Sequence, residues 1–219
     1  MSLKSSQKRS NPDFSLEIAS GLNPVCGIDE VGRGPLAGPV IAAAVMFESH
    51  DLGRFSFLSE INDSKKLTER KREALFDLIM AHAHVGVGEA SVEEIDRINI
   101  LQASLLAMSR AYQMMGKSCA LALVDGNKAP PLTTRVQTVI KGDSRSLSIA
   151  AASIVAKVTR DRLMRELDGA HPYYGWASNA GYGSAKHLAA LQEYGICDHH
   201  RKSFSPVRLI LEKSASRVV

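Results

Sequence analysis

Four acidic side chains of the sequence each lie at the end of an apolar segment. Asp29 and Glu30 end the run that begins at Val25, Asp125 ends a second run, and Asp143 follows a third. A carboxylate in an apolar strand is costly unless a cation or a set of donors neutralises it. Oxygen ligands without a histidine pair suit hard cations such as Mg²⁺ or Mn²⁺ and disfavour zinc. Together the acids predict two-metal hydrolysis of a phosphodiester, although each aspartate alone is also an ordinary turn residue.

A glycine-rich segment, residues 32–37, follows the first two acids. Its spacing matches the GxGxxA pattern with which some strand–helix units bind dinucleotides. That interpretation requires a helix to begin at the glycines, whereas Pro35 and Pro39 flank an apolar run typical of a strand. The pattern therefore favours a hairpin turn, in which Gly32 and Gly34 let the backbone approach another polymer and Arg33 meets phosphate.

Strands and helices are expected to alternate after this hairpin. We expect strands at residues 25–30, 39–47, 84–88, 119–124 and 136–140. We expect helices at residues 68–83, 91–116, 146–168 and 184–194, and a last one from residue 205. Ser91 and Glu94 form the capping box of the second helix. This order predicts an α/β fold, a mixed sheet flanked by helices with a helical C-terminal extension.

The composition is typical of one globular domain. Of the 219 residues, 45% are hydrophobic and 23% charged, and no apolar run reaches the ~18 residues of a membrane span. A net charge of +4 permits contact with a polyanion without requiring it. The 3 cysteines are far apart, which favours a reducing cytoplasm over a disulfide framework. We expect residues 1–22 to be a disordered tail without a secretory signal, and residues 23–219 to form the catalytic domain.

Several segments of the chain resemble ribonuclease HII. They are residues 27–40, 63–67, 124–126, 141–143, 148–161, 181–184 and 200–204, which span most of the chain. The resemblance implies a ribonuclease H-like fold in which Asp29, Glu30, Asp125 and Asp143 hold two Mn²⁺ or Mg²⁺ ions. It also implies a monomeric endonuclease that cuts the RNA strand of RNA:DNA hybrids. Single ribonucleotides in duplex DNA would be cut on their 5′ side, leaving 3′-hydroxyl and 5′-phosphate ends.

The same resemblance implies two kinds of substrate contact. The loop of Gly32, Arg33 and Gly34 would contact the 2′-hydroxyl, by which a protein distinguishes RNA from DNA, while Tyr182 stacks on a sugar. The expected phosphate contacts are Lys65, Lys66, Ser153 and Lys157. On spacing alone, Tyr182 could equally be a core or cap residue, and the lysines a solvated face. The histidines at 187, 199 and 200 are expected to be structural, because two-metal hydrolysis does not require imidazole.

Three other classes of protein would share part of these features. Ribonuclease HIII usually carries an extra N-terminal domain, whereas only a short polar tail precedes Val25. A non-catalytic hybrid binder would keep Arg33 and Tyr182 but could dispense with the acids. A dinucleotide oxidoreductase would respond to a nicotinamide cofactor and ignore chelators. The full acidic set therefore favours the nuclease.

Overall fold

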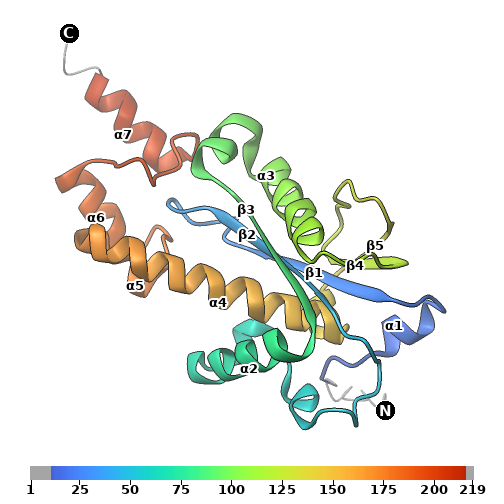
Figure 1. The fold of residues 1–219 in the computed structure, drawn as a ribbon. Coiled ribbons are helices and arrows are strands. Elements are labelled where there is room, and N and C mark those ends of the chain that lie inside the picture. Colours follow the sequence, from blue (N-terminus) through green and yellow to red (C-terminus); the bar gives the residue numbers. More distant parts are fainter. Residues whose placement is uncertain (1–10, 216–219) are drawn as a thin grey trace, which may run out of the picture.

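A computed structural model describes residues 11–215, which are built around one five-stranded mixed sheet (Figure 1). Its strands are β1 (Val25–Val31), β2 (Val40–Met46), β3 (His84–Ala90), β4 (Leu121–Asp125) and β5 (Arg135–Val139). Their order in space is β3-β2-β1-β4-β5. The pairs β1–β2 and β2–β3 are antiparallel, whereas β1–β4 and β4–β5 are parallel. The predicted hairpin and mixed sheet are confirmed.

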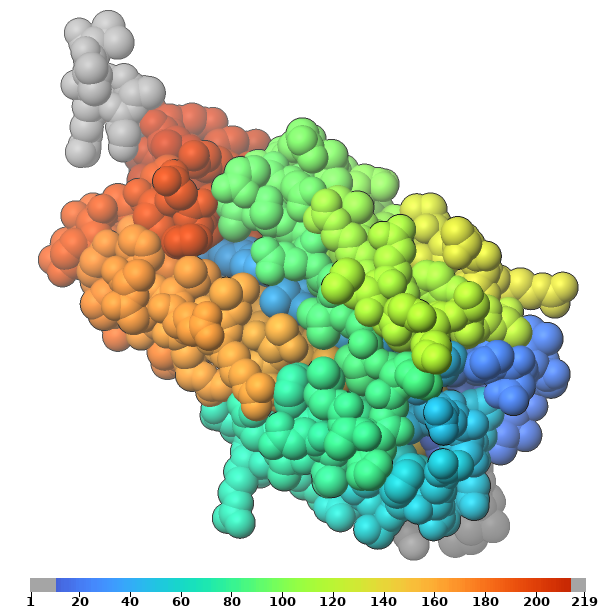
Figure 2. Space-filling view, viewed as in Figure 1, coloured from blue at the N-terminus to red at the C-terminus, as the bar shows by residue number. Residues whose placement is uncertain are grey.

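Helices cover both faces of this sheet. They are α1 (Ser15–Ala19), α2 (Glu69–His82), α3 (Val92–Met114), α4 (Leu147–Ala170), α5 (Trp176–Asn179), α6 (Ala185–Tyr194) and α7 (Ser205–Ala215). Short 3-10 turns lie at Ser56–Glu60, Ser64–Lys66, Gly142–Ser144 and Pro172–Tyr174. Figure 1 shows α3 on one face, α2 and α4 on the other, and α6 and α7 beyond one end of the sheet. In Figure 2, blue atoms from the early part of the chain remain visible between green α3 and orange α4.

Strand β2, which lies between β3 and the central strand β1, is buried along its whole length because helices pack against both of its faces. Ala43 and Val45 face the layer of α4, where they share a core with Ile154. Ala42 and Ala44 face the layer of α3 and belong to a second core. An apolar run without alternation is expected for a strand covered on both sides. The two cores fix the strand ends that carry the candidate site.

The predicted helix starts are largely confirmed by their caps. Ser91 accepts a hydrogen bond from the Glu94 amide, and the Glu94 carboxylate accepts one from the Ser91 amide, which completes the capping box. Ser146 caps α4 by accepting from the amide of Ile149 at 3.2 Å. The predicted helix over residues 91–116 is interrupted at Asn99, whose φ of 67° is left-handed. Asparagine tolerates that conformation and caps the next turn with its own side chain.

The structure corrects the predicted disordered tail over residues 1–22 for its second half. Residues 15–19 form α1, and the side chains of Phe14 and Glu17 are buried. Glu17 accepts hydrogen bonds from the Ser146 hydroxyl at 2.6 Å and the Ser148 amide at 3.0 Å, so this segment covers the start of α4. Residues 1–10 lie outside the described residues. The ordered domain therefore begins before residue 23.

The C-terminal extension packs on the turn between β1 and β2. Trp176, Leu191 and Val207 form a small core with Leu36 and Ala37 from that turn. The short helix α5 within this extension was not predicted. Of the helices in the described part of the chain, none combines the length and apolar character needed to cross a membrane.

Candidate active site

Asp29 and Asp125 lie next to each other because their strands are parallel neighbours. The register pairs Ile28 of β1 with Val124 of β4, so the next residue in each strand is one of these aspartates. Asp29 is buried, and its Oδ1 accepts a hydrogen bond from the Glu30 amide at 2.7 Å. The sheet therefore holds two carboxylates at one edge, as the sequence predicted for strand ends.

Asp143 is brought toward this pair by the turn that carries it. The Gly142 amide donates a hydrogen bond of 2.6 Å to Oδ1 of Asp125, which ties the turn to the end of β4. Glu30, the fourth predicted acid, forms an ion pair of 3.2 Å with Arg33. All four predicted acids thus lie on segments that meet at this edge, and one of them is already partly neutralised.

Burial and neighbouring charges raise the pKa of Asp29, Glu30 and Asp143. Burial raises the pKa of Asp29 well above its usual range, and the charges of Glu30 and Asp125 raise it further. Burial also raises the pKa of Glu30, although Arg33 opposes the shift. The pKa of Asp143 is raised by burial and then by the charges of Asp63 and Asp125. The carboxylates thus repel one another, and the positive charges of Arg33 beside Glu30 and of Lys65 and Lys66 near Asp143 offset this repulsion only in part.

This donor set fits a hard divalent cation by its chemistry. All four groups are carboxylates, and a nearby cation would relieve the repulsion that raises the pKa of the buried ones. As their side chains stand, however, no three histidine, cysteine, aspartate or glutamate groups in the described part of the chain are arranged to hold a metal ion. Metal binding would therefore require these side chains to adjust.

Ser153 lies differently from the predicted phosphate contact. Its side chain is buried on α4, where its hydroxyl lies 2.8 Å from that of Ser64 and acts to lower the pKa of Asp29. A buried hydroxyl with these partners has little surface to offer a phosphate. From this buried position Ser153 is instead suited to orient the carboxylate of Asp29.

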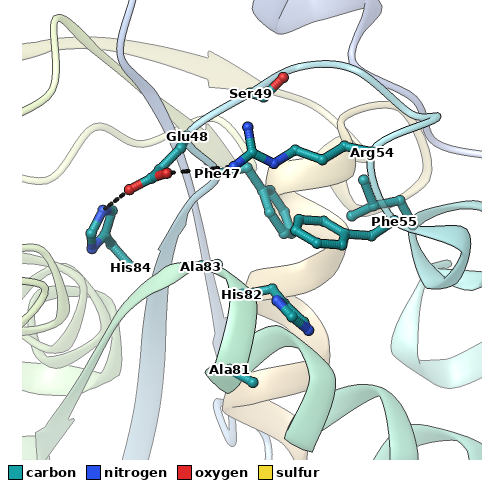
Figure 3. Close-up of a pocket in the computed structure, with 10 residues that line it drawn as sticks. Phe47, Glu48, Ser49, Arg54, Phe55, Ala81, His82, Ala83 and His84 are labelled. Carbon is teal, nitrogen blue, oxygen red and sulfur yellow. Dashed lines mark ion pairs between the residues drawn. The ribbon is translucent and has the colours of Figure 1, made fainter.

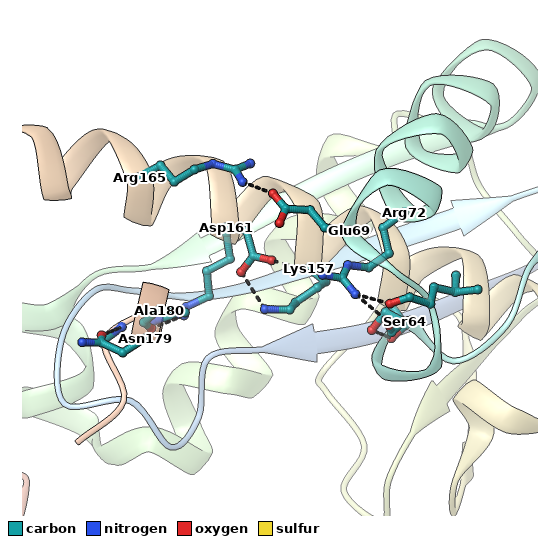
Figure 4. Close-up of polar contacts among 12 residues, drawn as sticks. Ser64, Glu69, Arg72, Lys157, Asp161, Arg165, Asn179 and Ala180 are labelled. Atoms are coloured by element: carbon teal, nitrogen blue, oxygen red, sulfur yellow. Dashed lines mark hydrogen bonds and ion pairs between the residues drawn. The ribbon is translucent and has the colours of Figure 1, made fainter. Parts of the chain in front are cut away.

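The three predicted lysine contacts lie along the surface near α2 and α4. Lys65 and Lys66 are exposed, and their charges oppose the raised pKa of Asp143. Lys157 donates a hydrogen bond of 2.6 Å to Asp161. Figure 4 shows Asp161 between Lys157 and Arg72, so this lysine is paired in the free protein.

The predicted recognition residues come together in the structure. We call residues 32–39 the glycine loop. The ring of Tyr182 lies against it, since a Cβ built at Gly34 would be 3.2 Å from Cε1 of that ring. The Leu36 amide donates to the Gly181 carbonyl at 2.8 Å, which joins the loop to the segment of Tyr182. Tyr182 is 51% exposed, so its ring is available for stacking.

A separate cavity of about 250 Å³ lies elsewhere and holds none of the predicted site residues (Figure 3). It is lined at the end of β2 by Phe47 and Glu48, with His84 and Arg54 on either side of the glutamate. The antiparallel register places this end of β2 away from the glycine loop, which precedes the strand. The group of acids and this cavity are therefore separate features.

Comparison with known proteins agrees with this arrangement. The sequence profile described as "Ribonuclease HII" matches residues 26–207. The chain belongs to the ribonuclease HII family. The ribonuclease HII of Paramagnetospirillum magneticum is 59% identical over 196 residues, which cover 90% of this chain and 96% of the relative. That of Rhodospirillum rubrum is 57% identical, with 93% of this chain and 94% of the relative covered.

Solved structures show the same fold. Ribonuclease H2 from Pyrococcus horikoshii OT3 matches with a TM-score of 0.70 at 28% identity, covering 86% of this chain and 97% of that chain. As a ribonuclease HII family member, the chain is a ribonuclease H, an endonuclease that hydrolyses phosphodiesters. Enzymes of this family act on RNA:DNA hybrids and use divalent metal ions.

Two residues near the candidate site were given no role by the sequence analysis. Asp63 and Ser64 lie in the segment of residues 63–67, in which only the lysines were assigned a contact. The charge of Asp63 raises the pKa of Asp143, and the Ser64 hydroxyl lies 2.8 Å from that of Ser153. The available signal was their position directly before Lys65 and Lys66 and after the apolar residues of the segment 55–61. Two arginines, Arg160 and Arg201, are buried beneath the glycine loop, and nothing in the sequence distinguished them from surface arginines.

Proposed function

We propose that this protein hydrolyses the RNA strand of RNA:DNA hybrids and cuts on the 5′ side of single ribonucleotides in duplex DNA. The products would carry 3′-hydroxyl and 5′-phosphate ends. The observation that supports this most is the group of partly buried carboxylates around Asp29 and Asp125, in which burial and neighbouring negative charges raise the pKa of Asp29 and Asp143. Such a group is suited to cation-dependent phosphodiester hydrolysis.

Asp29, Glu30, Asp125 and Asp143 would hold two Mg²⁺ or Mn²⁺ ions. When bound, the ions would supply activation of water and stabilisation of the leaving oxygen. The chain's own groups prepare the site for them. Ser153 orients Asp29, and the Gly142 amide fixes Asp125. Arg33 would have to leave Glu30 as a cation binds, which frees its guanidinium for phosphate.

Recognition of the ribonucleotide would fall to the glycine loop and Tyr182. The amides of Arg33 and Gly34 donate no hydrogen bond within the described part of the chain, so they are available to a 2′-hydroxyl. Tyr182 would stack on the adjoining sugar. Lys65, Lys66 and, once released from Asp161, Lys157 would contact phosphates. Ser153 acts on Asp29 in this proposal and not on a phosphate.

The setting of the activity is also part of the proposal. We infer a monomer that removes ribonucleotides from DNA in the cytoplasm. Its three cysteines are free thiols, as expected in a reducing compartment.

The proposal is tested with an end-labelled DNA duplex that contains one ribonucleotide. Cleavage on its 5′ side in the presence of Mg²⁺ or Mn²⁺, and none with a chelator, is the expected result. An all-DNA duplex should remain intact. A 2′,3′-cyclic phosphate product would refute the mechanism, because the 2′-hydroxyl would then be the nucleophile. Binding without cleavage would indicate a hybrid-binding protein instead.

A further inference from the structure

Two fully buried arginines lie beneath the glycine loop without a carboxylate partner. Arg160 of α4 is 1% exposed, and Arg201, which precedes α7, is 0% exposed. Neither forms an ion pair within the described residues, and every hydrogen bond that their guanidinium groups donate goes to a backbone carbonyl. Burial lowers the pKa of Arg160 to about 10 and that of Arg201 to about 9, so both are charged at neutral pH. Unpaired buried charge is costly, which points to a use for it.

Arg201 holds both ends of the glycine loop. Its Nη2 donates to the Gly32 carbonyl at 2.6 Å and to the Gly38 carbonyl at 2.8 Å, while its Nη1 donates to the Arg33 carbonyl at 3.1 Å. Its own amide donates to the carbonyl of Leu36 at 2.8 Å. A planar guanidinium with several donors can gather carbonyls in this way, whereas a lysine cannot.

Arg160 connects the same loop to the segment of Tyr182. It donates to Pro39 at 3.0 Å and Ala37 at 3.0 Å in the glycine loop, and to Ala180 at 2.8 Å on the other side. Ala180 has a left-handed φ of 48°, an unusual conformation for alanine, two residues before Tyr182. Figure 4 shows Asn179 and Ala180 at one end of the polar contacts around α4.

The two buried arginines also explain why residue 32 of the glycine loop is a glycine. A Cβ at Gly32 would lie only 2.3 Å from Nε of Arg160, so a side chain and the buried guanidinium could not both occupy that space. With the loop carbonyls drawn toward the two guanidinium groups, the amides of Arg33 and Gly34 are left without partners in the described structure. Positive charge behind these amides favours an oxygen in front of them.

We propose that Arg160 and Arg201 are positioning residues that fix the glycine loop relative to Tyr182 and thereby set how strictly the enzyme selects a single ribonucleotide in DNA. The inference rests on the proposed function, in which the loop and the tyrosine read the two sides of an RNA–DNA junction. Neither arginine touches substrate. Their effect reaches it through the carbonyls of the loop and of Ala180.

The test measures kcat and KM of the full-length protein on two substrates. One is a DNA duplex with a single ribonucleotide, and the other is a uniform RNA:DNA hybrid, in which neighbouring register positions are equivalent. For Arg160→Lys we expect the ratio of kcat/KM between the two substrates to fall about tenfold. Lysine keeps the charge, but its donors share one nitrogen and cannot reach the carbonyls that Nε, Nη1 and Nη2 of Arg160 bind separately. Arg162→Lys, on the exposed side of the same helix, is the matched control and should leave the ratio unchanged.

A double-mutant cycle with Tyr182→Ala separates positioning from general stability. If Arg160 acts through the position of Tyr182, Arg160→Lys should reduce the ratio much less in the Tyr182→Ala background. Because Arg160→Lys could lose its fold, Ala180→Val provides a second variant that alters no buried charge. A β-branched residue is disfavoured at the left-handed φ of residue 180, so the carbonyl to which Arg160 donates should shift, and we expect a roughly threefold loss of the ratio with the fold retained.

The outcomes distinguish this inference from the proposed function. A wild-type protein that cleaves neither substrate would refute the proposed function itself. A wild type that cleaves both, with an unchanged ratio in folded Arg160→Lys, would overturn only the positioning role. Equal losses on both substrates, in proportion to the fall in melting temperature, would also overturn the positioning role. An unchanged ratio in folded Ala180→Val would do so if Arg160→Lys is unfolded.

Discussion

Replacement of Glu17 by alanine should destabilise the protein, although the residue lies far from the acids in sequence. Its carboxylate is fully buried and accepts two hydrogen bonds at the N-terminus of α4, from the Ser146 hydroxyl and the Ser148 amide. Hydrogen bonds to a charged acceptor contribute about 1.5–3 kcal/mol each, and the helix terminus adds about 0.3–2 kcal/mol. Against this, Oε2 of Glu17 has no partner in the described residues, an arrangement that costs about 1–3 kcal/mol.

The net loss for Glu17→Ala is therefore roughly 3 kcal/mol. For a chain of this length, that corresponds to a fall in melting temperature of about 6–12 °C. Glu17→Gln keeps an oxygen acceptor and should lose only about 1 kcal/mol. The measurement is thermal and urea unfolding followed by circular dichroism.

The control for this experiment is Glu60→Ala, which removes an exposed carboxylate whose one ion pair within residues 11–215 is with Lys71 at 3.3 Å. It should change the free energy of unfolding by less than about 0.5 kcal/mol. The reasoning is refuted if the free energy of unfolding of Glu17→Ala differs from that of the wild type by less than the same margin. It also fails if Glu17→Gln is as unstable as the alanine variant, since the acceptor oxygen would then contribute nothing.

Further expectations concern the site and its surroundings. Asp29→Asn or Asp125→Asn should nearly abolish cleavage without unfolding the protein, and Asp143→Asn should impair it less; full activity of either of the first two at saturating metal would contradict the assignment. Tyr182→Ala should cost about 1–3 kcal/mol in kcat/KM on the single-ribonucleotide duplex and Tyr182→Phe less, so equal losses would exclude stacking. Hybrid affinity should fall as salt rises, and a flat titration would exclude phosphate contacts. Burial and the charge of His187 lower the pKa of His200 to about 4. Between about pH 6.5 and 4 the unfolded chain therefore binds a proton that the folded chain does not. The free energy of unfolding should then decrease as the pH is lowered, by up to ~1.4 kcal/mol per pH unit, and His200→Gln should reduce this slope.

The strands and the acids could be predicted because their signals are local. An apolar run followed by an aspartate is visible in the sequence, and the parallel register of β1 and β4 then brings Asp29 and Asp125 together. Local signals could not predict the role of Ser153. Its hydroxyl could be expected on a helix, but only the packing of α4 on β1 buries it against Asp29.

Buried charges were the features that local patterns could not reveal. Glu17 lies in a polar segment that resembles a solvated tail, and its partners are about 130 residues away in the chain. Arg160 and Arg201 look like ordinary surface arginines, because their acceptors are carbonyls, which every residue has. Only the three-dimensional arrangement distinguishes these groups from exposed ones.

Helix α4 has a consequence for where a strand can be cut. Ser153, which contacts Asp29, and Arg160, which holds the glycine loop, are seven residues apart on this one helix. That is two turns, or ~10 Å along a rigid rod. In the proposed function, the distance between the loop that recognises the ribonucleotide and the acids that cut beside it would thus be set by a helix and not by a flexible linker. Insertion of one residue between them would rotate one group by ~100° relative to the other, so the cut position cannot drift by small steps.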